Sequence, residues 1–293
     1  MIVTSYQILM YPQTLIGRIN KKEIYMRLLN RLTIPIFNYF SKNKFAQIFL
    51  EKNVRLSQRF MGIGSGGGVF SSGEQVIFDI LAKKYAPPYC IFDVGANKGQ
   101  FLSLALKKIS TNKFSIHCFE PGKETFKHLC ESGKDDRVLL NNIGIGDKKE
   151  EKTLYYDKIG SGLASLTKRR LDHFGIAFNE SETVQIETID NYCKEKNINR
   201  IHLLKIDIEG HELDAFAGAK EMFANNAIDI ITFEFGGCNI DTRTFFQDFW
   251  YFFLGMDMEL FRITPSGYLF SIEAYKEIDE QYRTTNFIAM KKG

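Results

Sequence analysis

The stretch Leu203–Glu212 places several ionisable side chains directly after an apolar run. Asp207, Glu209 and His211 surround a glycine turn, and carboxylates and imidazoles at the end of a strand are suited to proton transfer or metal binding. Lys205, within the apolar run, could bind an anionic substrate group or extend to the edge of its strand. We therefore treat these four residues as candidate catalytic residues, with helix capping as the alternative.

A second stretch has the pattern of a nucleotide-binding turn. Cys90–Phe101 runs from a short apolar strand through Asp93 and a glycine turn into an amphipathic helix. Gly95 lets the backbone approach a ligand closely, and the new helix presents unpaired N–H groups. Asn97 stands where a dinucleotide fingerprint would have its central glycine, with Gly99 following, so a nicotinamide cofactor is disfavoured.

Two further strand ends would complete such a pocket. Glu120 lies 25 residues after Gly95, close to the separation at which an acid meets ribose hydroxyls. A carboxylate can accept hydrogen bonds from both hydroxyls of a vicinal diol. Asn142 and Ile143 follow the third expected strand and could line an adenine pocket. The alternatives are a helix cap for Glu120 and a polar turn for Asn142.

From residue 74 onward, apolar strands alternate with amphipathic helices. This alternation predicts an α/β fold with a mainly parallel sheet covered on both faces, ending in an antiparallel edge. We expect residues 1–73 to be a helical segment with a glycine-rich joint or active-site loop at 62–68, and residues 74–293 to be one domain. Strands are expected over 89–94, 114–120, 137–145, 153–156, 183–187, 201–206, 228–235, 258–263, 268–272 and 286–290, and helices over 74–85, 97–109, 121–131, 189–196, 212–224 and 242–254.

The first sixty residues are basic and rich in aromatic side chains. They contain ten Lys or Arg and two acids, a net charge of +8, against +3 for all 293 residues. A basic amphipathic helix can lie on an anionic membrane surface or hold a lipid-linked acceptor, and it can equally pack on the main domain. The segment matches no nucleic-acid-binding motif, so nucleic acid is not an expected partner.

The cysteines and the hydropathy bear on location. The five cysteines are scattered without metal-binding spacing, which is typical of reduced thiols in the cytoplasm. No apolar run is long enough to span a membrane. We expect a cytoplasmic protein, with a membrane-peripheral position left open by residues 1–60.

Four ordered motifs resemble the FkbM family of S-adenosylmethionine-dependent methyltransferases. They are Phe92–Gly99 (FDVGANKG), Phe119–Pro121 (FEP), Glu187–Asp190 (ETID) and Leu204–Glu212 (LKIDIEGHE). The last motif is the most specific, because general Rossmann-like methyltransferases lack it. The resemblance covers about residues 75–290, and Lys98 departs from it, since the family more usually has an apolar residue there.

This resemblance implies a fold, an activity and a cofactor. The fold is a Rossmann-like, seven-strand methyltransferase sheet, mostly parallel with an antiparallel edge strand. The activity is transfer of a methyl group from S-adenosyl-L-methionine to a hydroxyl, typically of a sugar, glycan or polyketide-like natural product. The residues expected to bind the cofactor are Asp93, Gly95, Asn97, Gly99, Glu120, Asn142, Ile143 and Asp207.

The resemblance also leads to two hypotheses for catalysis, because an alcohol is a poor nucleophile until its proton is removed. In the first, Asp207 or His211 is the base and Glu209 orients it or the acceptor. In the second, Asp207, Glu209 and Glu234, which ends the apolar run at 230–233, hold a cation such as Mg²⁺ that lowers the hydroxyl pKa.

The nature of the acceptor and several alternatives stay open. The loop Gly160–Arg170 is expected to fold over the acceptor, with Lys168–Arg170 favouring an anionic one, or else to be a mobile surface loop. A nicotinamide-dependent oxidoreductase and a non-catalytic cofactor-binding module are the competing classes. A homodimer is also open.

Overall fold

The computed structural model describes residues 29–31, 33–38 and 41–292. Its contacts divide the chain into two compact units, Met1–Arg55 and Leu56–Gly293. This division falls earlier than the boundary at 73/74 expected from the sequence. The reason is that the glycine-rich segment packs within the second unit, where the Gly66 N–H donates to the Thr284 carbonyl at 3.0 Å.

The described part of the N-terminal segment is helical. Residues 29–31 and 33–38 are helical, and helix α2 spans Lys44–Phe60. Asn43 Oδ1 accepts a hydrogen bond from the Ala46 N–H at 2.9 Å and so caps the start of α2. Among the residues that the structure describes, no helix is both long and apolar enough to cross a membrane.

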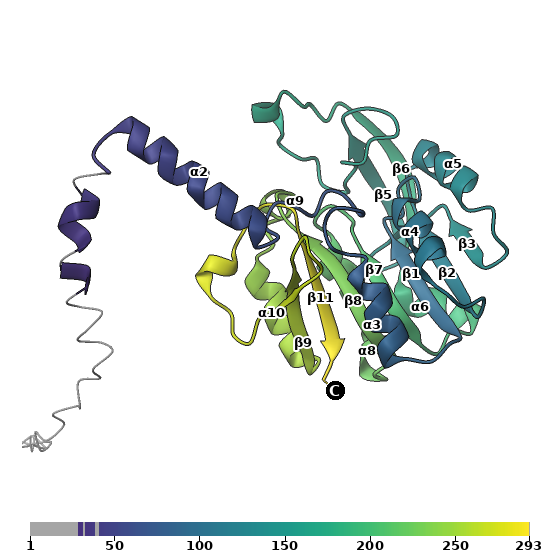
Figure 1. Ribbon diagram of the computed structural model, residues 1–293. Helices are drawn as coiled ribbons and strands as arrows, with labels where there is room; N and C mark the ends of the chain where they lie inside the picture. Colours follow the sequence, from purple (N-terminus) through teal and green to yellow (C-terminus); the bar gives the residue numbers. More distant parts are fainter. Residues whose placement is uncertain (1–28, 32, 39–40, 293) are drawn as a thin grey trace, which may run out of the picture. The chain divides into compact units, whose positions relative to one another are not determined.

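The second unit is built on an eight-stranded sheet (Figure 1), in the order β10-β9-β11-β8-β7-β1-β2-β3. The five strands from β8 to β3 are parallel, and β11 is antiparallel to both β8 and β9. The bounds are Tyr89–Val94 (β1), Phe114–Phe119 (β2), Val138–Asn141 (β3), Ile201–Ile206 (β7), Ile228–Phe235 (β8), Met258–Ile263 (β9), Leu269–Ser271 (β10) and Thr285–Lys291 (β11).

This arrangement confirms the expected α/β class and the mostly parallel sheet. Two details differ. Strand β10 is an eighth strand, paired to the outer side of β9. Strand β11 lies between β8 and β9, so an antiparallel strand stands inside the sheet as well as at its edge.

A second, three-stranded sheet has the order β4-β6-β5, with bounds Gly144–Ile145 (β4), Glu150–Tyr156 (β5) and Glu180–Glu187 (β6). The single strand expected over 137–145 is therefore wrong, because its two ends belong to different sheets. Between them, Asn142 Nδ2 donates to the carbonyls of Glu120 and Pro121 at 2.9 and 3.1 Å. These contacts fix the point at which the chain leaves the main sheet.

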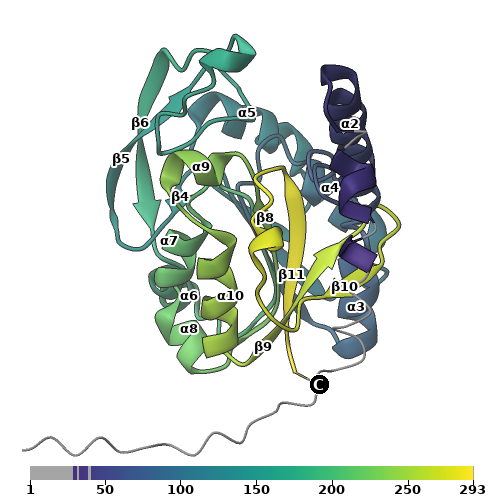
Figure 2. The ribbon, with the colours of Figure 1, turned by 90° about the vertical axis from the view of Figure 1, so that its left-hand side faces the viewer.

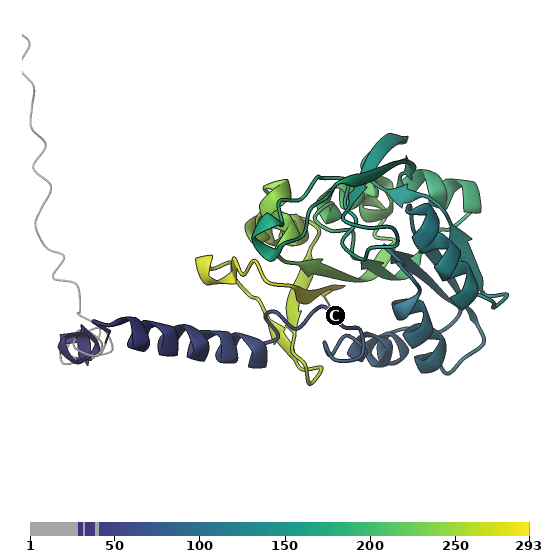
Figure 3. The same ribbon diagram turned by 90° about the horizontal axis from the view of Figure 1, so that it is seen from above.

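Helices cover both faces of the main sheet (Figures 2 and 3). Side chains of α6, α7, α8 and α10 share one apolar cluster with the strands, and those of α3, α4 and α5 share another. The bounds are Val76–Lys84 (α3), Gln100–Lys108 (α4), Lys123–Ser132 (α5), Ile189–Lys196 (α6), Glu212–Ala217 (α7), Lys220–Ala224 (α8), Cys238–Thr242 (α9) and Phe246–Gly255 (α10), with short 3₁₀ turns at Asp172–Phe174 and Glu277–Asp279.

Neighbouring residues of the central strands point into opposite clusters. Ile91 and Leu203 pack with α3 and α4, whereas Phe92 and Leu204 pack with the other helices. Successive side chains of a strand point to opposite faces, so a strand buried on both faces is mostly apolar. The apolar runs in the sequence thus identify β1 and β7 as central strands, with Asp93 and Lys205 as their charged exceptions.

The helix expected over 212–224 is interrupted at Gly218, between α7 and α8. A Cβ atom at Gly218 would lie 2.0 Å from the carbonyl oxygen of Gly146. The turn at Gly218 therefore lies directly against the chain that follows β4, and any side chain at this position would collide with it. Tertiary packing overrides local helix propensity here.

The order in which successive strands are added to the sheet reverses at β1, since β2 and β3 lie on one side of it and the later strands β7 and β8 lie on the other. At this switch point, the Asp207 N–H donates to the Val94 carbonyl at 3.0 Å. Gly95 has a φ of 77°, and a Cβ there would lie 1.9 Å from the Asp207 carbonyl oxygen. The turns after β1 and β7 therefore touch, and an open α/β sheet binds its ligand at such a point.

Gly95→Ala tests how much this contact contributes to stability. Gly175 also has a positive φ, of 70°, but a Cβ there would meet no atom within 4 Å. Gly175→Ala should therefore cost only the backbone strain of about 1 kcal/mol, whereas Gly95→Ala adds overpacking of about 1–3 kcal/mol. Urea unfolding of both variants measures the difference, and equal losses of stability would contradict the contact.

Candidate active site

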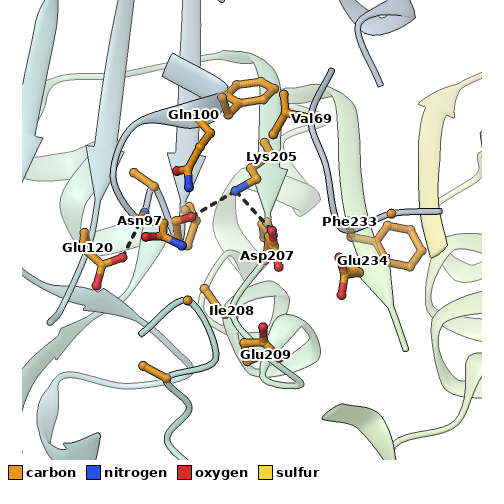
Figure 4. Close-up of a pocket in the computed structure, with 18 of the residues that line it drawn as sticks. Val69, Asn97, Gln100, Glu120, Lys205, Asp207, Ile208, Glu209, Phe233 and Glu234 are labelled. Carbon is orange, nitrogen blue, oxygen red and sulfur yellow. Dashed lines mark hydrogen bonds and ion pairs between the residues drawn. The ribbon is translucent and has the colours of Figure 1, made fainter. Parts of the chain in front are cut away.

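A cavity of about 640 Å³ opens at the carboxyl ends of β1, β2, β7 and β8. Its size falls within the range of ligand pockets, about 300–1,000 Å³. Three segments far apart in the sequence complete its wall, namely the glycine-rich segment 66–71, the loop 161–166, and residues at the start of β11. Polar groups of the central strands converge on this space, as Figure 4 shows. The sequence-predicted residues that line it are Gly95, Asn97, Glu120, Lys205, Asp207, Glu209 and Glu234.

Lys205 and Asp93 form a buried ion pair beneath the cavity. Lys205 Nζ lies 3.2 Å from Asp93 Oδ1 and donates to the Gly95 carbonyl at 3.0 Å. It also lies 3.6 Å from Asp207 Oδ2. The lysine therefore connects β7 with the turn that follows β1, and it neutralises a carboxylate that is fully buried.

The electrostatics of this group favour a charged lysine. Burial alone would lower the pKa of Lys205, but the carboxylates of Asp93, Asp207 and Glu74 together raise it above its usual value. Burial raises the pKa of Asp93, and Lys205 opposes that rise. The ammonium group thus keeps its proton at physiological pH and acts here as a fixed positive charge.

Glu120 holds the loop after β1 from the opposite side. Its Oε2 accepts a hydrogen bond from the Asn97 N–H at 3.0 Å, and its Oε1 accepts one from the Gly122 N–H at 2.9 Å. Burial raises the pKa of Glu120 to about 7, while these two hydrogen bonds oppose the rise. Each oxygen keeps a second lone pair, and the side chain lines the cavity, so a ligand diol could donate to it.

Asn97 presents an unsatisfied acceptor in the same region. Its φ of 48° is in the left-handed region, and its side chain lies beside Glu120 in Figure 4. Among the described residues, nothing donates a hydrogen bond to the buried Asn97 Oδ1. Because a buried polar atom normally has a partner, this oxygen is suited to accept from a ligand.

Three other residues expected to bind the cofactor lie outside the cavity wall. Gly99 precedes α4 and packs against Leu129 and Ser132 of α5. Asn142 and Ile143 also do not line the cavity, and the next residues, Gly144 and Ile145, do. The turn after β3 therefore contributes to the cavity, but through its last residues.

The motif after β7 separates into residues with different surroundings. Asp207 faces the cavity with its side chain 40% exposed. Glu209 pairs with Arg169 Nη1 at 2.5 Å. Glu212 is fully buried, and its Oε1 accepts from the N–H groups of Ile208 and Gly210 at 3.2 and 3.1 Å. Glu212 therefore holds the turn, Glu209 lines the cavity while paired with Arg169, and Asp207 lines it without an arginine partner.

His211 does not line the cavity, and both of its ring nitrogens contact side chains of the protein. Its Nδ1 lies 2.7 Å from Asp214 Oδ2, and its Nε2 lies 3.0 Å from Thr167 Oγ1. The contact with Thr167 connects the turn to the loop 160–170.

The structure does not support the magnesium hypothesis. Among the residues that it describes, no group of three or more His, Cys, Asp or Glu side chains is arranged to hold a metal ion. Glu209 is paired with Arg169, and Asp207 lies near Lys205. These contacts direct the carboxylates toward cations of the protein.

Reasoning from sequence missed several residues at the site. Glu74 is 5% exposed and lines the cavity, yet a single acid before a helix reads as a cap. Thr284 and Asn286 lie in a C-terminal strand without any motif. The glycine-rich run was the available signal, since one of its two interpretations was an active-site loop, and its last residues do line the cavity.

Comparisons with known proteins agree with this geometry. The sequence model of the family described as "Methyltransferase FkbM domain" matches residues 93–270. The chain is 26% identical over 183 residues to the "2-O-methyltransferase NoeI" of Sinorhizobium fredii, which covers 57% of this chain and 72% of the relative. It is 22% identical over 161 residues to the "Hexuronic acid methyltransferase AglP" of Haloferax volcanii, covering 55% and 60%.

Among solved structures, the FkbM methyltransferase of Methylobacillus flagellatus aligns with a TM-score of 0.41 and 16% identity, covering 68% of this chain and 43% of that one. The family match, in contrast, extends over more than half of the chain and includes the turns after β1, β2 and β7. The chain therefore belongs to the FkbM family of S-adenosylmethionine-dependent methyltransferases.

Proposed function

We propose that this enzyme methylates a hydroxyl group of a sugar, a glycan or a related natural product. The observation that carries the proposal is the contact between Gly95 and Asp207. It places the turn on the cofactor side directly against the backbone of Asp207, whose side chain lines the cavity. The names of the two relatives, a 2-O-methyltransferase and a hexuronic acid methyltransferase, support a sugar hydroxyl as the acceptor. The match to a methyltransferase family disfavours the two alternatives, a nicotinamide-dependent oxidoreductase and a non-catalytic cofactor-binding module.

The residues of the cavity fit S-adenosylmethionine. The cofactor supplies a methyl group on a positively charged sulfonium, so it brings its own electrophile. Glu120 would accept hydrogen bonds from the ribose hydroxyls, and Asn97 Oδ1 has no partner among the described residues. The excess of carboxylates around the cavity also suits a cationic ligand. The protein then has to hold and orient the cofactor and the acceptor, and to exclude water.

Asp207 is our candidate for the general base. Its carboxylate faces the cavity, whereas the carboxylate of Glu209 pairs with Arg169 and both nitrogens of His211 have partners. A hydroxyl group brought to the cavity could transfer its proton to an Asp207 oxygen as its own oxygen takes the methyl group. The bond from the methyl carbon to the sulfonium sulfur would break in the same step, so the cofactor would leave as the neutral thioether. Lys205 Nζ lies 3.6 Å from an oxygen of this carboxylate.

Glu120→Gln tests the assignment of the ribose site. The amide would direct its NH₂ group at the N–H of Asn97 or Gly122 and would remove an acceptor for the diol. Because hydrogen bonds to a charged group contribute about 1.5–3 kcal/mol, the Kd for S-adenosylmethionine should rise about 10- to 100-fold.

Calorimetric titration of the cofactor measures this Kd, with Glu124→Gln on the exposed first turn of α5 as control. The wild-type affinity should also rise between about pH 6 and pH 8, because Glu120 with its pKa of about 7 must ionise to accept both bonds. This rise should be smaller in Glu120→Gln. An unchanged Kd in the variant would refute the assignment.

Asp207→Asn and His211→Gln separate the two candidate bases. Loss of a general base typically costs about 10²–10⁴ in kcat. Asp207→Asn should show such a loss with nearly unchanged cofactor affinity, and His211→Gln should lose less than about tenfold, since its ring does not line the cavity. Single-turnover transfer of labelled methyl groups measures both. A larger loss in His211→Gln than in Asp207→Asn would reverse the assignment.

A further inference from the structure

We propose that the methylated acceptor is an uncharged, hydroxyl-rich sugar ring, and that a ring carrying a carboxylate or phosphate is rejected. This inference rests on the proposed sugar hydroxyl and adds the charge class of the acceptor. It follows from how the cations near the cavity are used and from which polar groups remain.

The ionisable groups that line the cavity are mostly acidic. Among the described residues of the wall, Lys205 is the one Lys, Arg or His, while five carboxylic acids contribute to it. An anionic acceptor would therefore need a cation that is free to pair with it, because burying an unpaired charge beside like charges is costly. The lining acids are Glu74, Glu120, Asp207, Glu209 and Glu234.

Lys205 is already committed to groups of the protein. Its side chain is 8% exposed, and its Nζ lies within 3.6 Å of Asp93, Gly95 and Asp207. Two of these partners are carboxylates, so the ammonium charge is compensated before any acceptor enters. To meet an acceptor anion, Lys205 would have to leave the fully buried Asp93 without a cation, which is strongly unfavourable.

The basic run Lys168–Arg170 does not supply the missing cation. Arg169 is buried, and its guanidinium lies 2.5 Å from Glu209 and 3.4 Å from Asp241. Lys168 and Arg170 are exposed, and neither they nor Arg169 line the cavity. The run anchors its loop to the turn after β7 instead of facing the acceptor.

The anchoring extends along the loop that forms this wall. Ser165 Oγ donates to the Glu209 carbonyl at 2.9 Å, and Thr167 Oγ1 contacts His211 Nε2 at 3.0 Å. Ser161 to Leu166, which lead up to these anchors and include the first of them, line the cavity. The loop thus presents apolar and hydroxyl-bearing residues to the cavity. Its arginine, Arg169, forms an ion pair with Glu209 of the protein.

Strands β8 and β11 offer neutral hydrogen-bonding groups. Glu234 pairs in register with Asn286, and Thr232 and Thr284 stand two residues away along their respective chain segments. All four line the cavity. Residues two apart in a strand share a face. A hydroxyl, an amide and a carboxyl group side by side can exchange hydrogen bonds with the hydroxyls of a sugar.

In its ionised form, Glu234 adds to the rejection of anions. Burial, followed by the nearby Asp207 and Glu209, raises the pKa of Glu234 well above its usual value. The carboxyl groups here already compete for the same few negative charges. A carboxylate on the acceptor would join this group and would have to be protonated, or displace a charge, in order to bind.

The first experiment identifies the charge class of the methylated sugar. The full chain is incubated with glycans of its own cells and isotopically labelled S-adenosylmethionine, and the product is hydrolysed to monosaccharides and passed over an anion exchanger. We expect the label in unretained, neutral O-methyl sugars. Label in retained, acidic sugars would overturn the inference while leaving the proposed function intact. Absence of label from every sugar would overturn the proposed function, and the inference with it.

The second experiment uses matched acceptors, benzyl β-glucopyranoside and benzyl β-glucuronide, which differ only at C6. The glucoside should be favoured in kcat/KM by at least about tenfold, because the like charge has no partner. Where neither compound is methylated, the two are compared as inhibitors of glycan labelling, with the same ratio expected. Equal values, or preference for the glucuronide, would overturn the inference.

Glu234→Gln tests the contribution of this side chain to the discrimination. The amide keeps the size of Glu234 but cannot ionise, so the ratio between the two acceptors should fall at least about threefold at an alkaline pH, at which Glu234 is ionised in spite of its raised pKa. Glu221→Gln, on an exposed position of α8, is the matched control and should leave the ratio unchanged. A ratio that stays the same in Glu234→Gln would exclude this carboxyl group from the selection, and a changed ratio in Glu221→Gln would contradict a local effect.

Discussion

The buried ion pair between Lys205 and Asp93 is the interaction on which the rest of the site depends. It lies at the point where the strand order of the sheet reverses, and it joins the ends of β1 and β7. Two opposite charges removed from water stabilise a fold only when they stay together, and loss of one partner leaves an uncompensated buried charge, at a cost of about 3–5 kcal/mol. The hydrogen bond from Lys205 to the Gly95 carbonyl extends this constraint to the cofactor turn.

The carboxyl groups near this pair differ in function because they differ in surroundings. Glu212 is fully buried and accepts backbone N–H groups, so it holds the turn after β7. Glu209 is neutralised by Arg169 and anchors a loop. Asp207, within the same motif, keeps its side chain toward the cavity. A run of acids that looks uniformly catalytic in sequence thus contains two carboxylates that line the cavity, of which Glu209 is paired with an arginine and Asp207 is not.

The loop at 160–170 shows how positive charge can be present near a cavity without being offered to it. Arg169 reaches two carboxylates, Glu209 and Asp241, that belong to different parts of the chain. A guanidinium held in this way orders the loop through charge-assisted hydrogen bonds. The surface that the loop presents to the acceptor is consequently uncharged, and β8 and β11 continue it with hydroxyl and amide groups.

The sequence by itself determined the fold class, the positions of the central strands along the chain and the cofactor motifs. Mostly apolar runs such as 89–94 and 201–206 are local patterns, and their bounds were predicted to the residue because strands buried on both faces have few polar side chains. The turn at Gly95 and the acid at Glu120 were also recognisable, since their separation along the chain is typical of a nucleotide-binding βαβ unit.

Only the tertiary structure decided which ionisable groups face the cavity. The sequence shows that residues 205 and 211 are a lysine and a histidine, but not what they contact. Their partners, Asp93 and Asp214 among them, determine whether these side chains are available to a ligand. The break at Gly218 and the exit of the chain after Asn141 likewise depend on contacts with distant segments. Charge pairing and close packing are set by residues that are distant in sequence and close in space, so a pattern of neighbours along the chain does not contain them.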